Sequence, residues 1–168
     1  MDCRGRYDFY CPESPEDMAD TDPDADLDPA FQTVFENRVR FAETDLQGVV
    51  FYGEYFTYQD EAVTAFFREI GYSYDRMVEA GWQVHVVSAS LDYRDGAEFD
   101  DRLRNRIRVS DVGTSSLTFE HRIEREDGSL VAEGTVTHVA VDLETEAPTP
   151  LPDDFLEAIA TYQGGLPE

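Results

Sequence analysis

The fold is decided by the stretch Glu43-Thr44-Asp45-Leu46-Gln47-Gly48-Val49-Val50-Phe51-Tyr52-Gly53-Glu54-Tyr55. A strand-like run precedes this stretch, and a run with helical spacing of apolar residues follows it. A junction of this kind can hold a carboxylate close to the free N–H groups of a helix start. The stretch therefore pairs a base or nucleophile, Asp45, with a place that stabilises negative charge.

The hydrophobic pattern on both sides of this junction predicts an α+β domain. Apolar residues recur at helical spacing over residues 55–70, and from residue 84 onward the period changes to two. An Asp127-Gly128 pair predicts a hairpin turn between two strands. We therefore expect one long helix packed on a curved antiparallel sheet. The predicted strands are 31–41, 84–93, 103–109, 116–125 and 130–142, and the predicted helices are 55–70, 74–80 and 153–162.

The charge of the chain restricts its partners. The chain has 168 residues and a formal net charge of −24, and all 13 of its basic residues are Arg. So acidic a protein is a poor binder of nucleic acid or of an anionic membrane surface. Carboxylates stay hydrated at molar salt, where the Debye length is only about 3 Å. The composition therefore indicates a halophilic protein with a solvated acidic surface.

The N-terminal part of the chain differs in composition from the rest. Asp nearly alternates with small residues and Pro over residues 20–28, and we interpret residues 1–30 as an acidic, disordered extension of a domain over residues 31–168. The extension has no apolar segment of the kind found in signal peptides, so we expect a cytoplasmic protein. Cys3 and Cys11 form no zinc-ligand pattern, and no apolar run reaches the roughly 18 residues of a membrane span.

Several common catalytic motifs are missing from the sequence. There is no Gly-rich phosphate loop, no Gly-x-Ser-x-Gly elbow and no Cys/His nucleophile pair. Their absence excludes most hydrolases of the serine and cysteine types and most nucleotide-dependent enzymes.

The junction also carries a family signature. The run from Arg40 to Tyr55 resembles the start of hot-dog-fold acyl-CoA thioesterases, above all the 4-hydroxybenzoyl-CoA thioesterase family with its Tol–Pal-associated branch. The resemblance extends over residues 34–143. It implies a hot-dog fold, a long central helix wrapped by a curved antiparallel sheet. The positions that match the family motif are Asp45, Gly48, Val49, Val50, Phe51, Tyr52 and Tyr55.

This resemblance implies a mechanism and a set of site residues. Asp45 would attack the thioester carbonyl or activate a water, the Tyr52 N–H would polarise the thioester oxygen, and Gly48 would allow close approach. The resemblance implies no metal and no cofactor, with CoA entering as part of the substrate. It also implies a homodimer or homotetramer with the active site between subunits. The expected substrate contacts are Val50, Phe51, Tyr55 and Arg94, with Arg102 and Arg122 as further candidates for the CoA phosphates.

Alternatives remain open at several of these positions. Asp45 has a second interpretation as the N-cap of the helix, and in another hot-dog branch the working carboxylate lies on the helix, where Asp60 and Glu61 stand. The Arg residues that alternate along 102–108 form either a charge-paired solvent face or a ledge for CoA phosphates. Glu54 replaces a common Asn, which leaves acyl specificity open. Other activities are a hot-dog hydratase or dehydratase and a non-catalytic acyl-CoA-binding module.

Overall fold

The computed structural model describes residues 31–167, so the predicted acidic extension and both cysteines lie outside the described residues. Every helix and strand predicted from the hydrophobic pattern is present, with shifts of a few residues at the ends. None of the helices in this part of the chain is both long and apolar enough to cross a membrane. The elements are β1 (Gln32–Arg38), a 3-10 turn η2 (Phe41–Glu43), α1 (Glu54–Glu69), α2 (Tyr74–Glu79), β2 (Trp82–Tyr93), β3 (Arg102–Val112), β4 (Ser116–Arg125), β5 (Leu130–Asp142) and α3 (Asp153–Gln163).

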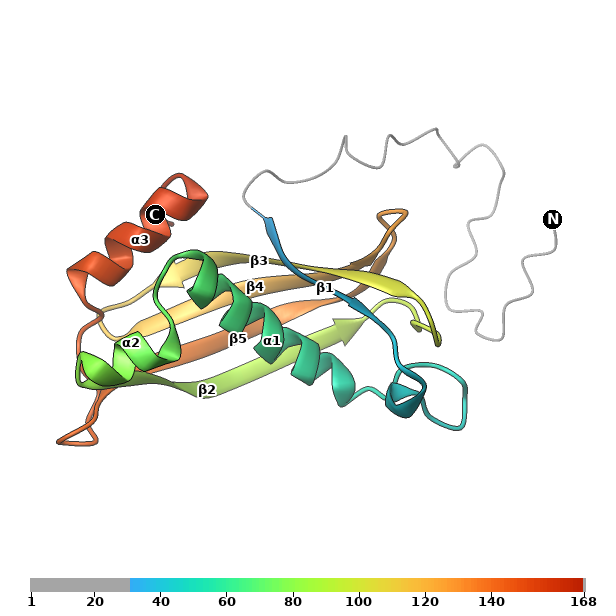
Figure 1. Cartoon of the computed structure of the whole chain (residues 1–168), viewed down its shortest axis with the longest axis horizontal. Coiled ribbons are helices and arrows are strands. Elements are labelled where there is room, and N and C mark those ends of the chain that lie inside the picture. Colours follow the sequence, from blue (N-terminus) through green and yellow to red (C-terminus); the bar gives the residue numbers. More distant parts are fainter. Residues whose placement is uncertain (1–30, 168) are drawn as a thin grey trace.

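The five strands form one antiparallel sheet in the order β1-β3-β4-β5-β2. Strands β3, β4 and β5 follow one another as an antiparallel meander, whereas β2 does not pair with β3 and lies at the far edge beside β5. The long helix α1 separates β1 from β2 and carries the chain across the sheet, so β2 arrives at the opposite edge beside β5 (Figure 1). The connection over residues 94–101 then returns to β3, beside β1.

Helix α1 lies across one face of the sheet, and its direction is opposite to that of β2 (Figure 1). Its buried side chains follow helical spacing, which places them on a single face toward the sheet. Residues of α3, among them Phe155 and Ile159, join the same core from the other end of the chain. The buried residues of α1 are Tyr55, Tyr58, Gln59, Ala62, Val63, Phe66 and Phe67.

The core between α1 and the sheet consists of two separate apolar clusters. Leu103 of β3 and Ile123 of β4 belong to the cluster under the start of α1. Ile107 and Phe119 of the same two strands belong to the cluster under its second half. Between them lies a row of residues that are not apolar. It consists of the buried side chains of Gln59 of α1, Asn105 of β3 and His121 of β4, and of the half-buried Gly134 of β5, which pairs with His121.

This polar row is only partly satisfied by hydrogen bonds. Asn105 donates to the side-chain oxygen of Asn37 at 2.9 Å. Neither ring nitrogen of His121, nor the side-chain nitrogen of Gln59, has a hydrogen-bond partner within the described residues. Burial lowers the pKa of His121 to about 3, so the imidazole is neutral at physiological pH. The row therefore marks a polar boundary inside an otherwise apolar core.

Candidate active site

The predicted junction folds as a small hairpin between η2 and α1. Thr44 and Val50 form a bridge, and the Asp45 N–H donates to the Val49 carbonyl at 2.9 Å. The Gly48 N–H donates to the Asp45 carbonyl at 3.0 Å, which closes a tight turn. Gly48 has φ +84° in this turn, a left-handed conformation that side chains disfavour. The shape of the hairpin therefore favours glycine at position 48.

The hairpin holds the Asp45 carboxylate in a defined direction. One carboxylate oxygen accepts a hydrogen bond from the Gln47 N–H at 2.7 Å, and the side chain is partly exposed. The second oxygen has no hydrogen-bond or ion-pair partner among residues 31–167. Helix α1 has Gly53 as its N-cap, so the alternative that Asp45 caps this helix is wrong. Asp45 thus presents a carboxylate oxygen that is free to accept a proton or to attack.

The start of α1 supplies donors beside this carboxylate-bearing hairpin. Gly53 has no side chain to cap the helix, and the Tyr52 N–H donates no hydrogen bond within the described residues. Uncapped N–H groups at a helix start, together with the helix dipole, stabilise negative charge. The Tyr52 carbonyl accepts a hydrogen bond from the Tyr93 hydroxyl at 3.0 Å, which fixes the chain just before the helix. Sequence reasoning missed this role of Tyr93, because the pattern identified Tyr93 only as the last residue of a predicted strand.

An ion pair fixes the chain that enters the hairpin. The buried Glu43 carboxylate accepts hydrogen bonds from the Arg40 backbone N–H and side chain, at 2.6 to 2.9 Å. Burial opposes ionisation, but the bonds from Arg40 hold the pKa of Glu43 below its ordinary value. The Glu43 carbonyl in turn accepts from the Phe51 N–H at 2.9 Å. Sequence reasoning missed this pair, although opposite charges three residues apart before a helix were a visible signal.

The connection between β2 and β3 forms a platform beneath the hairpin. The Val50 N–H donates to the Ala97 carbonyl at 2.8 Å, and the Ala97 N–H donates to the Tyr55 hydroxyl at 3.2 Å. Val50 and Tyr55 are buried in the cluster under the start of α1. Phe51 is 45% exposed on the outer side. Of these three predicted substrate contacts, the structure places Phe51 at the surface and the other two as packing beneath the site; their contact with substrate stays a prediction.

The predicted phosphate-binding arginines all have carboxylate partners. Arg94 and Arg122 both pair with Glu133, at 2.8 and 3.9 Å, and Arg102 pairs with Glu126 at 3.1 Å. A CoA phosphate would therefore have to share these arginines with the protein's own carboxylates. On the alternating row of β3, the ion pairs are Arg104–Glu36, Arg106–Glu124 and Arg108–Glu120, so the row is charge-paired, as one of the two expectations held. It is not a solvent face throughout, because Arg106 is buried.

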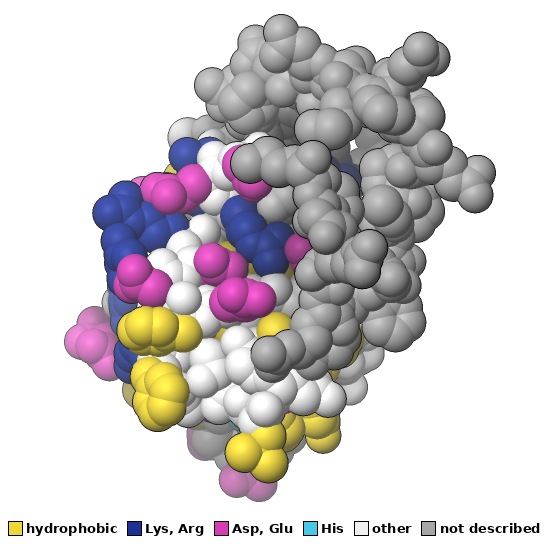
Figure 2. Space-filling model, turned by 90° about the vertical axis from the view of Figure 1, so that its right-hand side faces the viewer, with side chains coloured by type: hydrophobic (Ala, Val, Ile, Leu, Met, Phe, Trp, Pro, Cys, Tyr) yellow, Lys and Arg dark blue, Asp and Glu magenta, His cyan; other side chains and the backbone are white. Residues whose placement is uncertain are grey.

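Exposed hydrophobic side chains surround the hairpin. Figure 2 shows several separate groups of them at this end of the molecule, beside basic and acidic side chains. Large exposed apolar groups next to a candidate site mark a surface for a ligand or another protein. The exposed residues in and near the hairpin are Phe41, Leu46, Phe51, Tyr52, Phe56, Tyr93 and Phe99.

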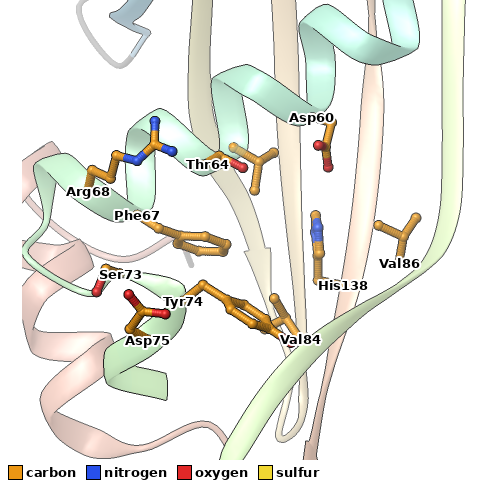
Figure 3. Close-up of a pocket in the computed structure, with 11 residues that line it drawn as sticks. Asp60, Thr64, Phe67, Arg68, Ser73, Tyr74, Asp75, Val84, Val86 and His138 are labelled. Carbon is orange, nitrogen blue, oxygen red and sulfur yellow. The ribbon is translucent and has the colours of Figure 1, made fainter. Parts of the chain in front are cut away.

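A pocket of about 440 Å³ lies along the second half of α1. Its walls come from α1, α2, β2 and β5, and it contains Asp60, one of the two helix carboxylates considered as an alternative to Asp45 (Figure 3). None of the predicted site residues of the hairpin lines it. Within one chain, the carboxylate-bearing hairpin and the pocket therefore lie at different ends of α1.

No group of three His, Cys, Asp or Glu side chains in residues 31–167 is arranged to hold a metal ion. The candidate site is instead a single carboxylate on a rigid hairpin beside an uncapped helix start. This pairing suits the addition of an oxygen nucleophile to a carbonyl, because a carboxylate can activate the nucleophile while N–H groups stabilise the developing oxyanion.

Comparison with known proteins connects this geometry to a family. The model of the thioesterase-like superfamily matches residues 39–159, which include the hairpin, α1 and most of the sheet. The acyl-CoA thioesterase YbgC of Haemophilus influenzae is 30% identical over 125 residues, covering 74% of this chain and 91% of the relative. The 1,4-dihydroxy-2-naphthoyl-CoA hydrolase of Synechocystis is 25% identical over 127 residues, covering 74% of this chain and 92% of the relative.

Solved structures give the same result for the fold. The 1,4-dihydroxy-2-naphthoyl-CoA thioesterase Slr0204 of Synechocystis matches with a TM-score of 0.70 and 25% identity, covering 75% of this chain and 93% of its own. The protein TT1821 of Thermus thermophilus matches with a TM-score of 0.71 and 32% identity, covering 77% of this chain and 98% of its own. The predicted hot-dog fold is confirmed.

Proposed function

Because the chain belongs to the thioesterase-like superfamily, we propose that it hydrolyses acyl-CoA thioesters to the free acid and CoA. The observation that carries this proposal is the hairpin itself, which holds a carboxylate with a free oxygen beside an uncapped helix start. The names of the relatives from Haemophilus influenzae and Synechocystis, both hydrolases of acyl-CoA compounds, support the same activity.

The proposed chemistry divides between Asp45 and the start of α1. The Asp45 carboxylate either takes a proton from a water that attacks the carbonyl carbon, or attacks that carbon itself to form an anhydride that water then opens. In both routes the Tyr52 N–H donates to the carbonyl oxygen as it becomes negative. The C–S bond then breaks, and the CoA thiolate takes up a proton. Removing an oxyanion donor typically costs about 2.7–4 kcal/mol, and general base catalysis contributes about 10² to 10⁴ in rate.

The substitution Asp45→Asn tests this role directly. It keeps the acceptor oxygen for the Gln47 N–H, so the hairpin should fold, while turnover of a panel of acyl-CoA esters should fall at least about 100-fold. The matched control is Asp92→Asn, an exposed carboxylate near the end of β2, which should retain full activity. Thiol release that is unchanged in Asp45→Asn would contradict the assignment. Binding of acyl-CoA by the parent chain without any thiol release would instead favour the binding module, and hydration of an enoyl-CoA would favour a hydratase.

We also propose that two copies of the chain complete each site. The outer edge of β2 has no neighbouring strand among the described residues, and its central residues 86–90 are exposed. Such an edge is suited to pairing with a second strand. If two β2 edges pair antiparallel, the symmetry also places the two α1 helices side by side in opposite directions. The hairpin of one copy then comes toward the pocket of the other.

Complementation between two inactive variants tests this shared site. Asp45→Asn removes the carboxylate, and Thr64→Trp fills the pocket with a larger side chain. In a one-to-one mixture of the two variants, half of the dimers are mixed and each has one intact site, so about one quarter of the parent activity should return. The refuting result is a mixture that stays as inactive as its two components although mass measurements show mixed dimers. It would mean that the hairpin and the pocket do not form a site across two copies of the chain.

We also propose that the protein works in a cytoplasm of high salt. Within the superfamily, we propose that it belongs near the 4-hydroxybenzoyl-CoA thioesterase branch. The net charge of −24 and the complete use of Arg over Lys support the salt-adapted setting. Arginines of the sheet are engaged with carboxylates, which leaves the excess of acidic groups hydrated at the surface.

A further inference from the structure

The peptide that joins Tyr52 to Gly53 lies just before α1 and takes no part in the hydrogen bonds of the helix. The Glu54 N–H donates to the Phe51 carbonyl at 2.9 Å, which closes a turn around this peptide. The Phe56 N–H donates to the Gly53 carbonyl at 3.1 Å and not to the Tyr52 carbonyl. Within residues 31–167, the Gly53 N–H has no acceptor. The helix therefore does not fix the direction of this peptide.

Two conformations of the peptide are compatible with the turn. In a type I turn both central residues have negative φ, whereas in a type II turn the central peptide is rotated and the residue after it has φ of about +80°. That residue is Gly53, and glycine adopts positive and negative φ about equally well. The structure has Gly53 at φ −68° and ψ −27°, as in the type I form. The residues of the turn permit either form, so a contact from outside the turn can decide between them.

Tyr93, at the end of β2, makes that contact. Its hydroxyl donates to the Tyr52 carbonyl at 3.0 Å, which is the one hydrogen bond made to this peptide by any group in residues 31–167. The ring of Tyr93 packs edge-on against the buried ring of Tyr55, at a centroid distance of 5.4 Å, and this packing orients the hydroxyl. Partial burial raises the pKa of Tyr93, so the hydroxyl keeps its proton at neutral pH.

The direction of the Tyr52 carbonyl sets the direction of the Gly53 N–H. The two groups belong to one planar peptide and point in opposite directions. Consecutive N–H groups at a helix start point the same way, so in the type I form the Gly53 N–H lies beside the free Tyr52 N–H. In the rotated form the Tyr52 carbonyl would take the place of the Gly53 N–H. A negative oxygen bound at the helix start would then meet an acceptor instead of a second donor.

We propose that Tyr93 is a positioning residue of the active site: its hydroxyl holds the peptide in the type I form, so that the Gly53 N–H joins the Tyr52 N–H as a second donor to the thioester oxygen. This rests on the proposed function, because a second donor matters only where a carbonyl oxygen becomes negative. When the nucleophile adds to the carbonyl carbon, the π electron pair moves to the oxygen, and both N–H groups stabilise its charge. When the C–S bond breaks, the C=O bond re-forms and the electron pair leaves with sulfur.

The first test removes only the hydroxyl. Tyr93→Phe keeps the ring that packs on Tyr55, and kcat for the best ester of the acyl-CoA panel should fall about 10- to 100-fold, because one oxyanion donor is lost in the rotated form. KM should change less than about threefold, because the charge appears only in the transition state. The control Tyr72→Phe removes a hydroxyl that donates to the Asp154 carboxylate at 2.9 Å, beyond the far end of α1, and should keep the kcat of the parent. An unchanged kcat in Tyr93→Phe, or an equal loss in the control, would overturn the inference.

A second substitution separates positioning from a general loss of structure. Alanine at position 53 disfavours the positive φ of the rotated form by a factor of about 5 to 30, whereas it is unstrained at φ −68°. The nearest atom to its methyl group belongs to the ring of Phe51, at 2.9 Å, a side chain that can move. The loss of kcat caused by Tyr93→Phe should therefore be at least about threefold smaller in the Gly53→Ala background than in the parent. An equal or larger loss in that background would contradict the role given to Tyr93.

A binding experiment decides the role of Gly53 separately from turnover. The probe is benzoyl-CoA, titrated onto isotope-labelled Asp45→Asn protein and followed by NMR through the Gly53 amide signal. Binding should shift the Gly53 amide proton downfield, and Tyr93→Phe should reduce this shift at least about twofold. The amide of Gly71, which donates to the Arg68 carbonyl at the far end of α1, should not move.

The outcomes of this titration separate the inference from the proposed function. A Gly53 shift that depends on Tyr93, in a parent that releases no thiol from any ester, would support the inference while the proposed function fails. Thiol release by the parent together with an unmoved Gly53 signal, or with a shift that Tyr93→Phe leaves unchanged, would overturn the inference while the proposed function stands.

Discussion

His121 makes the stability of this protein depend on pH in a way that can be calculated. The ring is fully buried in the polar row between the two core clusters, and burial lowers its pKa from an ordinary 6.5 to about 3. In the unfolded chain the same ring takes up a proton near pH 6.5. Between these two values the unfolded state binds more protons than the folded state, so stability is complete above pH 6.5 and is lost as the pH falls.

The size of the loss follows from the two pKa values. Each pH unit below 6.5 costs about 1.4 kcal/mol, so at pH 5 His121 alone reduces the free energy of unfolding by about 2 kcal/mol. His138, whose pKa is lowered to about 4, adds a similar amount over the same range. The carboxylates whose pKa values are lowered, such as Glu43 and Asp127, begin to lose stability only below about pH 4.5. The interval from pH 7.5 to 5 therefore isolates the two histidines.

The substitution His121→Leu separates the contribution of His121. Leucine has a similar volume and removes two nitrogens that have no partner in the described residues, so the variant should fold and be at least as stable as the parent at pH 7.5. Urea unfolding at constant KCl, followed by the fluorescence of Trp82, gives the free energy at each pH. The parent should lose about 4 kcal/mol between pH 7.5 and 5, and the variant about 2. Parallel pH dependence in the two proteins would refute the reasoning, because it would mean that His121 is hydrated or paired in solution.

Three further outcomes follow from the same structure. Gly48→Ala should lower the free energy of unfolding by about 1–2 kcal/mol and reduce turnover, because φ +84° strains any side chain. Gly48→Asn should lower the free energy of unfolding by less. Equal urea midpoints for both variants and the parent would contradict this. Gly134→Ala places a methyl group against the Ser90 carbonyl and should lower the free energy of unfolding by about 1–3 kcal/mol. The control Gly113→Ala meets only the movable Ser116 hydroxyl and should lower it by less. If Gly134→Ala were as stable as Gly113→Ala, this would argue against the close approach of β2 and β5. Raising KCl from 0.1 to 2 M should raise the melting temperature by at least about 5 °C as the excess carboxylates are screened, and a flat or falling curve would exclude a halophilic protein.

The sequence was sufficient to predict the helices and strands and to locate the stretch around Asp45, because both depend on local patterns. Helical spacing identified α1, alternation identified the strands, and the run around Asp45 marked the hairpin. The position of β2 in the sheet does not follow from a local pattern. It pairs with β5 because α1 crosses the sheet before β2 begins, and the alternation within β2 would be the same at either edge of the sheet. Tyr93 was missed for the same reason, since its hydroxyl reaches a carbonyl on another part of the chain.

The pocket was out of reach of sequence reasoning on different grounds. Asp60 was an alternative to Asp45 as the working carboxylate, and His138 was simply part of the predicted strand 130–142. His138 is indeed packed, at 4% exposure, yet it also lines a pocket, and only three-dimensional contact shows that Asp60 faces it. A buried histidine gives no sequence signal of whether its nitrogens are satisfied, because that depends on neighbours from three other elements.

The polar row separates the packing beneath the Asp45 hairpin from the packing around the pocket. Gln59 divides α1 into a first half, whose Tyr55 packs under the hairpin, and a second half, whose Phe67 forms a wall of the pocket. A cluster transmits a packing defect to residues in contact with it, and the row interrupts that contact between the two clusters. The hairpin that carries Asp45 can therefore stay rigid while the pocket wall changes to suit another acyl group. If two copies pair through β2, each complete site takes its chemistry from one cluster and its selectivity from the other, so substitutions at Phe67 should change which substrate is preferred more than they change the turnover of the best substrate.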